Sequence, residues 1–106
     1  MTRGDIFRVR LPARRGSGHV QHGARYAVIL QADAFLSLST AIVAPTSTAA
    51  APATFRPVIT LEDTPTRILV EQLRTIDLHH LTDHVGHLTT AEQRAVDTAL
   101  ELVLDL

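Results

Sequence analysis

The chain has 106 residues, no cysteine and a formal net charge of −1. This length fits one domain with its own buried core, and the lack of cysteine excludes disulfides and thiolate metal sites. The N-terminal residues lack the apolar core of a signal peptide, and no apolar run approaches the length of a membrane span. We therefore expect a single domain over residues 1–106, in a soluble cytoplasmic protein with no membrane partner.

The charges are distributed unevenly along the chain. Residues 1–57 carry seven arginines and two acids, for a charge of +5, whereas residues 58–106 carry three arginines and nine acids, for a charge of −6. Such segregation indicates an anionic partner for the N-terminal half, and pairing between the two halves inside the fold explains it about as well.

The first part of the chain predicts two strands joined by a basic loop. Apolar residues alternate from Asp5 to Leu11, which predicts a strand with Arg8 and Arg10 on its more polar face. The loop follows and ends at Ala24. Residues 26–31 then form a nearly continuous apolar run, typical of a central strand covered on both faces.

A helical turn, a third strand and a loop are expected next. Residues 33–37 should make one helical turn capped by Asp33. Residues 40–44 predict another buried strand, which Pro45 ends or forces to an edge of the sheet. The Ala-rich stretch from Thr48 to Thr54 has no periodicity, which favours a mobile loop.

The second half predicts extended structure interrupted by turns. The expected strands cover residues 55–61, 67–72, 73–76 and 83–88. A turn at residues 62–65 and a helical turn at residues 78–82 separate them.

The C-terminal residues predict the clearest helix of the chain. Thr89 and Glu92 have the spacing of a capping box. An apolar face with i, i+3, i+4, i+7 spacing follows, made of Val96, Ala99, Leu100 and Val103. Five or six strands and one closing helix predict a mainly β (α+β) fold, a small and strongly curved antiparallel sheet or barrel.

Two segments carry residues suited to holding a phosphate. In residues 23–30, Arg25 lies where a glycine-bearing loop leads into an apolar strand. The next strand ends in the hydroxyls of Thr46, Ser47 and Thr48. If these strands pair, Arg25 and one hydroxyl could converge on a phosphate, whose oxygens match the planar guanidinium donors. An arginine at a strand entrance and hydroxyls that bond their own backbone explain the same residues without a ligand.

Four motifs, in this order and spacing, resemble the MazF/PemK family of toxin endoribonucleases. They are Arg3-Gly4-Asp5-Ile6-Phe7, Gly18-His19-Val20-Gln21-His22-Gly23-Ala24-Arg25, Pro45-Thr46-Ser47 and Glu71-Gln72-Leu73-Arg74-Thr75-Ile76-Asp77. The pattern of residues 81–88 before an amphipathic helix also fits the family, so the similarity covers nearly the whole chain.

The resemblance implies an SH3-like small barrel of five to seven strands with a C-terminal helix. It also implies a homodimer with an RNA groove along it, and sequence-selective cleavage of single-stranded RNA that needs no metal and no cofactor. The 2′-hydroxyl would attack the adjacent phosphorus and leave a 2′,3′-cyclic phosphate and a 5′-hydroxyl. A cognate antitoxin would occupy the same groove, and operator DNA would be reached only indirectly, through that antitoxin.

Motif positions also imply functional residues. Arg25 matches the family's active-site arginine and Ser47 its hydroxyl, so these two are the expected catalytic residues. The expected RNA-binding residues are Glu71, Gln72, Gln21, His19, Thr46, Thr48, Arg14 and Arg15.

Three positions depart from the family pattern. Tyr26 follows the arginine where relatives often have proline, and Ser47 stands where threonine is more usual. Val20 occupies a position where many relatives place a glutamate, so a carboxylate that could orient RNA or move a proton is absent. The general base is therefore open, and His19 or His22 could serve because imidazole titrates near neutrality.

The C-terminal histidines are not expected to bind a metal. His80 and His84 have the i, i+4 spacing of a helical metal site, but the strand expected there separates their rings. Two other functions are consistent with the same fold. One is a non-enzymatic, CcdB-like inhibitor of DNA gyrase, and the other is a degenerate toxin that retains only antitoxin or operator binding.

Overall fold

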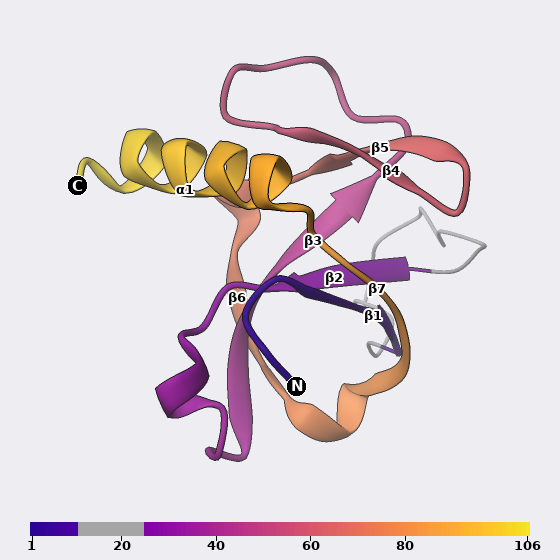
Figure 1. The fold of residues 1–106 in the computed structure, drawn as a ribbon, viewed down its shortest axis with the longest axis vertical. Helices are drawn as coiled ribbons and strands as arrows, with labels where there is room; N and C mark the ends of the chain where they lie inside the picture. Colours follow the sequence, from indigo (N-terminus) through magenta and orange to yellow (C-terminus); the bar gives the residue numbers. More distant parts are fainter. Residues whose placement is uncertain (11–24) are drawn as a thin grey trace, which may run out of the picture.

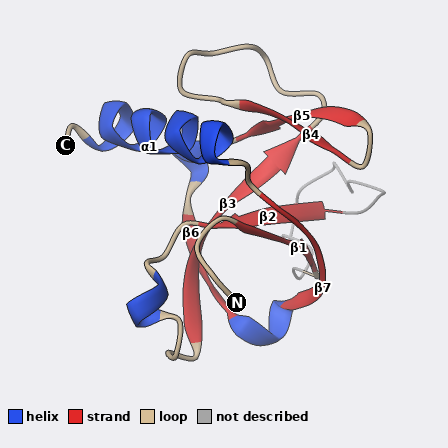
Figure 2. Cartoon of the chain, in the orientation of Figure 1, coloured by secondary structure: helices blue, strands red, loops and turns tan. Residues whose placement is uncertain are grey.

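The computed structural model describes residues 1–10 and 25–106. In this part of the chain, seven strands precede one α-helix (Figures 1 and 2). The strands are β1 (Asp5–Val9), β2 (Arg25–Ile29), β3 (Thr40–Ser47), β4 (Val58–Leu61), β5 (Thr64–Ile68), β6 (Arg74–Asp77) and β7 (Leu81–His87). The helices are α1 (Thr90–Leu104) and the 3₁₀ turns η1 (Asp33–Phe35), η2 (Val70–Gln72) and η3 (Leu78–His80).

The strands form one antiparallel sheet in the order β4-β5-β3-β2-β1-β7, and β6 pairs with β3. Strand β3 is the centre of this arrangement. One of its edges pairs with β2, while the other pairs first with β6, over residues 40–43, and then with β5, at residues 46–47. The sheet curls into a half-barrel with α1 on one side (Figure 1), which confirms the mainly β fold expected from the sequence.

The curled sheet is covered on both faces. Side chains alternate between the two faces of a strand, so Val28 and Leu30 enter one apolar cluster while Ala27 and Ile29 enter another. The larger cluster is closed by Val96 and Ala99 of α1, which are 0% and 2% exposed. The nearly continuous apolar run of β2 therefore has the cause predicted from the sequence, burial on both faces.

Pro45 neither ends β3 nor places it at an edge of the sheet, contrary to the prediction. The strand continues to Ser47, and the Pro45 carbonyl accepts a hydrogen bond from the backbone N–H of Leu69 at 2.9 Å. In an extended strand the N and C=O of one residue point the same way, so the missing N–H of Pro45 faces the gap between β6 and β5. No ladder bond is lost there, and this allows proline inside a central strand.

Other boundaries also differ from the prediction. Ala32, rather than Asp33, is the N-cap of η1, and Asp33 Oδ1 instead accepts a hydrogen bond of 2.6 Å from the backbone N–H of Arg3. Strand β4 begins at Val58 and not at Phe55. The strand expected over residues 67–72 ends at Ile68, because the chain turns into η2 and buries Val70 completely.

The helix and its cap are as predicted. The Thr89 side chain accepts a hydrogen bond from the Glu92 backbone N–H, and the Glu92 side chain accepts one from the Thr89 N–H, so both halves of the capping box are formed. Within the described residues, no helix has the length and apolar composition needed to cross a membrane.

Candidate active site

One face of the sheet is hollowed into a pocket of about 410 Å³. Residues of β1, β2, β3 and β6 line it, and the strand registers bring them together. Arg25 lies opposite Val9, Ala27 opposite Pro45, and Val43 opposite Arg74. The described residues that line the pocket are Val9, Arg25, Tyr26, Ala27, Val43, Pro45, Thr46, Ser47, Ala50, Arg56, Leu69, Gln72, Arg74 and Ile76.

Arg25 and Ser47 both line this pocket, although 22 positions separate them in the sequence. Arg25 is the first residue of β2 and is exposed, and Ser47 is the last residue of β3 and is half-buried. Because β2 and β3 are antiparallel neighbours, the start of one strand lies beside the end of the other. The pairing of two strands therefore joins a cation and a hydroxyl at one surface.

The Ser47 hydroxyl accepts a hydrogen bond of 3.1 Å from the Ala49 backbone N–H. This is the local backbone contact expected of a serine at the start of a loop. A hydroxyl that accepts one bond still has its proton to donate. The contact thus orients the Ser47 oxygen and leaves the donor available to a ligand in the pocket.

The neighbouring threonines differ from one another. The Thr46 hydroxyl donates a hydrogen bond of 3.1 Å to the carbonyl oxygen of Tyr26, which ties β3 to β2 at the pocket. Thr48 is exposed and lies outside the described lining. Thr46 has a structural role here whether or not it also contacts RNA.

Glu71 and Gln72 both belong to η2, but they have different environments. Gln72 is exposed and lines the pocket. Glu71 forms an ion pair with Arg56, whose Nε lies 2.9 Å from Glu71 Oε1. The Glu71 carboxylate is thus already bound to a cation, whereas the Gln72 amide faces the pocket.

The pocket is cationic. Among its described lining residues are three arginines, Arg25, Arg56 and Arg74, and no aspartate or glutamate. Neither Arg56 nor Arg74 is among the site residues expected from the sequence. Arg74 could have been found, because it alternates with Ile76 on a strand opposite Val43. Arg56 comes from the loop before β4, where no periodicity indicates which way a side chain points.

Four of the expected RNA-binding residues, Arg14, Arg15, His19 and Gln21, lie outside the described residues, as do Val20 and His22.

Tyr26, which follows Arg25 where relatives often have proline, contributes to the pocket wall. Its hydroxyl donates a hydrogen bond of 2.8 Å to Glu62 Oε2. The guanidinium of Arg8 lies 5.8 Å from the centre of the Tyr26 ring. Tyrosine at this position therefore links β2 to the β4–β5 turn.

Two of the four C-terminal histidines contact the carboxylate of Asp5. His84 and His87 of β7 contact Asp5 Oδ1 at 3.0 and 2.8 Å, which separates His84 from His80 as the predicted strand requires. Burial alone would raise the pKa of Asp5. Hydrogen bonds from His87, the Thr2 backbone and His84 outweigh burial and lower the pKa from 3.8 to about 2.

The fold is shared with a class of small bacterial toxins. A Mycobacterium tuberculosis structure described as toxin MazF-mt6 superposes with a TM-score of 0.79 at 20% identity and covers 96% of this chain and 97% of its own. A structure described as an endoribonuclease in complex with its cognate antitoxin, from Mycobacterial species, has a TM-score of 0.81 at 20% identity, over 100% of this chain and 96% of its own. A MazE–MazF structure (Form-II) from Deinococcus radiodurans has a TM-score of 0.79 at 17% identity, over 100% and 96%.

Sequence comparison then gives the family. The family model described as PemK-like, MazF-like toxin of type II toxin–antitoxin system matches residues 2–104. The candidate toxin Rv3098A/RVBD_3098A of Mycobacterium tuberculosis (strain ATCC 25618 / H37Rv) is 40% identical over 106 residues, which cover 98% of this chain and 97% of that protein. The chain belongs to the PemK/MazF family of toxins, as its four motifs indicated.

Proposed function

We propose that this protein is a sequence-selective, metal-independent endoribonuclease that cleaves single-stranded RNA in the cytoplasm, as the toxin of a type II toxin–antitoxin pair. The observation that carries the proposal is the pocket in which Arg25 and Ser47 lie together with two further arginines. A cationic surface of this kind suits a polyanionic substrate. Exposed bases of single-stranded RNA can be read by polar groups at the pocket, such as the amide of Gln72.

In the proposed reaction the 2′-hydroxyl attacks the adjacent phosphorus and the bond to the 5′-oxygen breaks. The products are a 2′,3′-cyclic phosphate and a 5′-hydroxyl, with one proton removed from the nucleophile and one given to the leaving oxygen. Negative charge accumulates on the phosphoryl oxygens in the transition state. Arg25 supplies a permanent positive charge beside those oxygens, and a cation placed where negative charge develops lowers the free energy of the transition state.

Ser47 is proposed to donate its proton to a non-bridging or leaving oxygen. Its orientation by the Ala49 N–H favours this role over that of a mobile surface hydroxyl. Arg25 is unsuited to proton transfer because a guanidinium stays protonated in proteins. The described lining of the pocket contains no imidazole and no carboxylate, so the general base is expected from outside it, with His19 and His22 as the available imidazoles.

The proposed partners follow from the family. A homodimer would present two such pockets along one RNA groove, and a cognate antitoxin would cover that groove. The related mycobacterial protein is described as an endoribonuclease in complex with its cognate antitoxin, and the similarity of fold supports a partner of the same kind for this chain.

The test is incubation of the purified protein with a long RNA in the presence of EDTA, followed by mapping of the cut ends. Discrete cuts with 2′,3′-cyclic phosphate ends are expected for the wild type. We expect losses of about 10²–10³-fold for Arg25→Ala and smaller losses for Ser47→Ala, because each removes a group aimed at developing charge. Arg94→Ala, on the exposed face of α1, is the matched control.

Three outcomes would contradict the proposal. Cutting that persists at the wild-type rate in both Arg25→Ala and Ser47→Ala would show that the site is elsewhere. Intact RNA together with inhibited supercoiling by gyrase would favour the CcdB-like function, and intact RNA with antitoxin binding alone would favour a degenerate toxin.

A further inference from the structure

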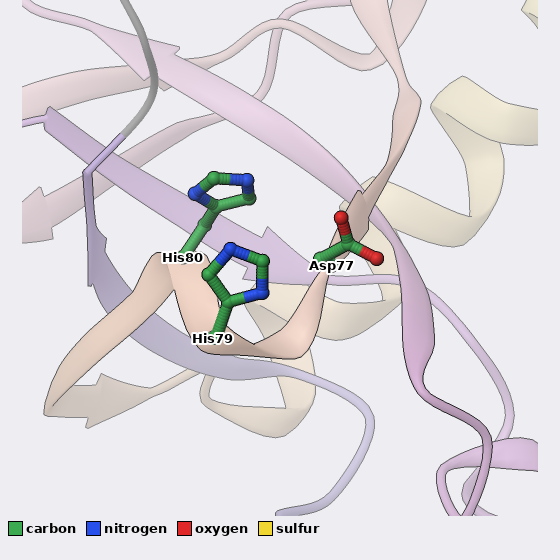
Figure 3. Close-up of side chains that lie close together, drawn as sticks. All are labelled: Asp77, His79 and His80. Carbon is green, nitrogen blue, oxygen red and sulfur yellow. The ribbon is translucent and has the colours of Figure 1, made fainter.

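A second cluster of chemically active side chains lies outside the pocket. Asp77, at the end of β6, and His79 and His80, in the η3 turn, each have a ligand atom within 4.8 Å of the ligand atoms of the other two. Figure 3 shows the two imidazole rings beside each other and the carboxylate of Asp77 on the same side of the turn. From this arrangement, we propose that Asp77, His79 and His80 form a binding site for a Zn²⁺-like transition-metal ion.

The backbone holds these three residues in place. Asp77 pairs with Thr40 in the β3–β6 ladder, and the Leu78 N–H donates to the Ser39 carbonyl at 3.0 Å. The His80 carbonyl accepts a hydrogen bond of 2.9 Å from the Arg10 N–H. The Cα positions of the ligands are therefore fixed by the sheet before any metal binds, and only side-chain rotations remain to be ordered.

The side chains themselves are available. Asp77 is the N-cap of η3, yet its carboxylate makes no capping hydrogen bond to the described backbone of that turn. The ring centroids of His79 and His80 are 4.2 Å apart and the rings are tilted by 39°. Among the described residues, the three side chains make no hydrogen bond or ion pair, in contrast to His84 and His87, whose rings are bound to Asp5.

The donor set indicates the kind of ion. Two imidazole nitrogens and one carboxylate oxygen suit Zn²⁺ and its transition-metal neighbours, whereas Mg²⁺ and Ca²⁺ prefer oxygen ligands alone. Ligands of a tetrahedral Zn²⁺ lie about 3.4 Å apart, as bond lengths of about 2.0–2.2 Å require, so ligand atoms within 4.8 Å of one another need to close by at most about 1.4 Å. Three protein ligands leave the fourth position to water.

The site is separate from the proposed cleavage reaction. Asp77, His79 and His80 are absent from the described lining of the pocket, although β6 also carries the pocket residues Arg74 and Ile76. The metal would join the end of β6 to η3 and stabilise this corner of the sheet. RNA cleavage in EDTA and zinc binding are therefore independent measurements, and failure of one leaves the other intact.

The test is calorimetric titration of the untagged, full-length protein with Zn²⁺ alone, with thermal unfolding as a second readout. One ion per chain and a rise in Tm are expected, with no effect of Mg²⁺. His79→Ala, His80→Ala and Asp77→Asn should each weaken the affinity for Zn²⁺ by at least about tenfold. Removing a residue that only hydrogen-bonds to a metal ligand already lowers metal affinity by about 10–100-fold. Circular dichroism of each variant without metal checks that the fold is retained.

His84→Gln and the double variant His19→Ala/His22→Ala are the controls, since they remove other imidazoles of the chain. Both should bind Zn²⁺ as the wild type does. A wild type without zinc binding would overturn the proposal. So would folded His79→Ala and His80→Ala variants with unchanged affinity, or loss of binding only in the control variants.

Discussion

Arg56 and Glu71 form an ion pair beside the Arg25–Ser47 pocket, with 2.9 Å between Arg56 Nε and Glu71 Oε1. The same guanidinium donates from Nη1 to the Ala51 carbonyl at 3.0 Å. Arg56 therefore connects the loop that follows β3 to the η2 turn that carries Gln72. A carboxylate expected to read RNA bases is thus paired with the guanidinium of Arg56.

We expect Arg56→Ala to change the selectivity of cleavage more than its rate at the best site. The substitution frees the Glu71 carboxylate to accept from base amino groups and releases the loop from η2. Half-buried ion pairs of this kind contribute on the order of 1 kcal/mol, which corresponds to about a fivefold change in relative rates between RNA sequences. Mapping cut ends on one long RNA measures this, with Arg94→Ala as control. An unchanged distribution of cuts would show that the ion pair has no part in selectivity.

Substitutions of Ser47 test whether its hydroxyl takes part in cleavage, independently of the Arg56→Ala test of the loop after β3. Ser47→Thr keeps the hydroxyl and should retain cleavage within about tenfold, whereas Ser47→Ala should lose about 10–100-fold because one donor to the phosphate is gone. Thr98→Ala, which removes an exposed hydroxyl on α1, should cut as the wild type does. Equal losses in the Thr and Ala variants would indicate that packing, and not the hydroxyl, matters at this position.

Much of this arrangement could be predicted from local pattern. The apolar run of β2 indicated burial on both faces, and the Thr89–Glu92 spacing indicated the helix start, because both signals depend on neighbouring residues. The continuation of β3 through Pro45 could not be predicted, since it depends on β3 changing its partner from β6 to β5.

The functional residues show the same limit. The motifs of the family pointed to Arg25 and Ser47, but Arg56 comes from a loop without periodicity and pairs with Glu71 of another segment. Nothing in the sequence indicates that the Glu71 carboxylate is paired with Arg56. Tertiary contacts of this kind become visible only when the fold brings the segments together.

The pH dependence of cleavage should identify the missing base. Guanidinium and serine hydroxyl groups do not titrate near neutrality, and the described lining of the pocket holds no imidazole or carboxylate. We expect the acidic limb of the rate profile to disappear in either His19→Ala or His22→Ala, measured on a single cut site. His79→Ala is the control, because that residue lies outside the pocket. Unchanged profiles in both the His19→Ala and the His22→Ala variants would exclude these imidazoles.

The helix cap should contribute measurably to stability. Thr89→Ala removes the hydroxyl that accepts the Glu92 N–H, and losses of this kind typically cost about 1 kcal/mol of unfolding free energy. Thr98→Ala, an exposed position within α1, should leave stability unchanged or slightly higher, because alanine is the better helix former. Urea unfolding of both variants gives the comparison, and equal midpoints would contradict the role of the cap.

Asp5 should make the stability of the fold depend on pH. Its carboxylate accepts hydrogen bonds from His87, from the Thr2 N–H and from His84, and these lower its pKa from 3.8 to about 2 in spite of burial. A lowered folded-state pKa contributes stability that is fully present above the unfolded-state value and is lost as the pH falls towards 2. A shift of this size corresponds to about 2 kcal/mol.

Asp5→Asn should therefore lower the unfolding free energy by about 2 kcal/mol at pH 7, and the difference from the wild type should shrink to about half near pH 3. Asp63→Asn is the matched control, because Asp63 is exposed at a positive φ of 62° that asparagine also tolerates. Urea unfolding of the three proteins from pH 7 to pH 3 makes the measurement. A difference that stays constant over this range would show that Asp5 stabilises the β1–β7 contact through its shape and not through its charge.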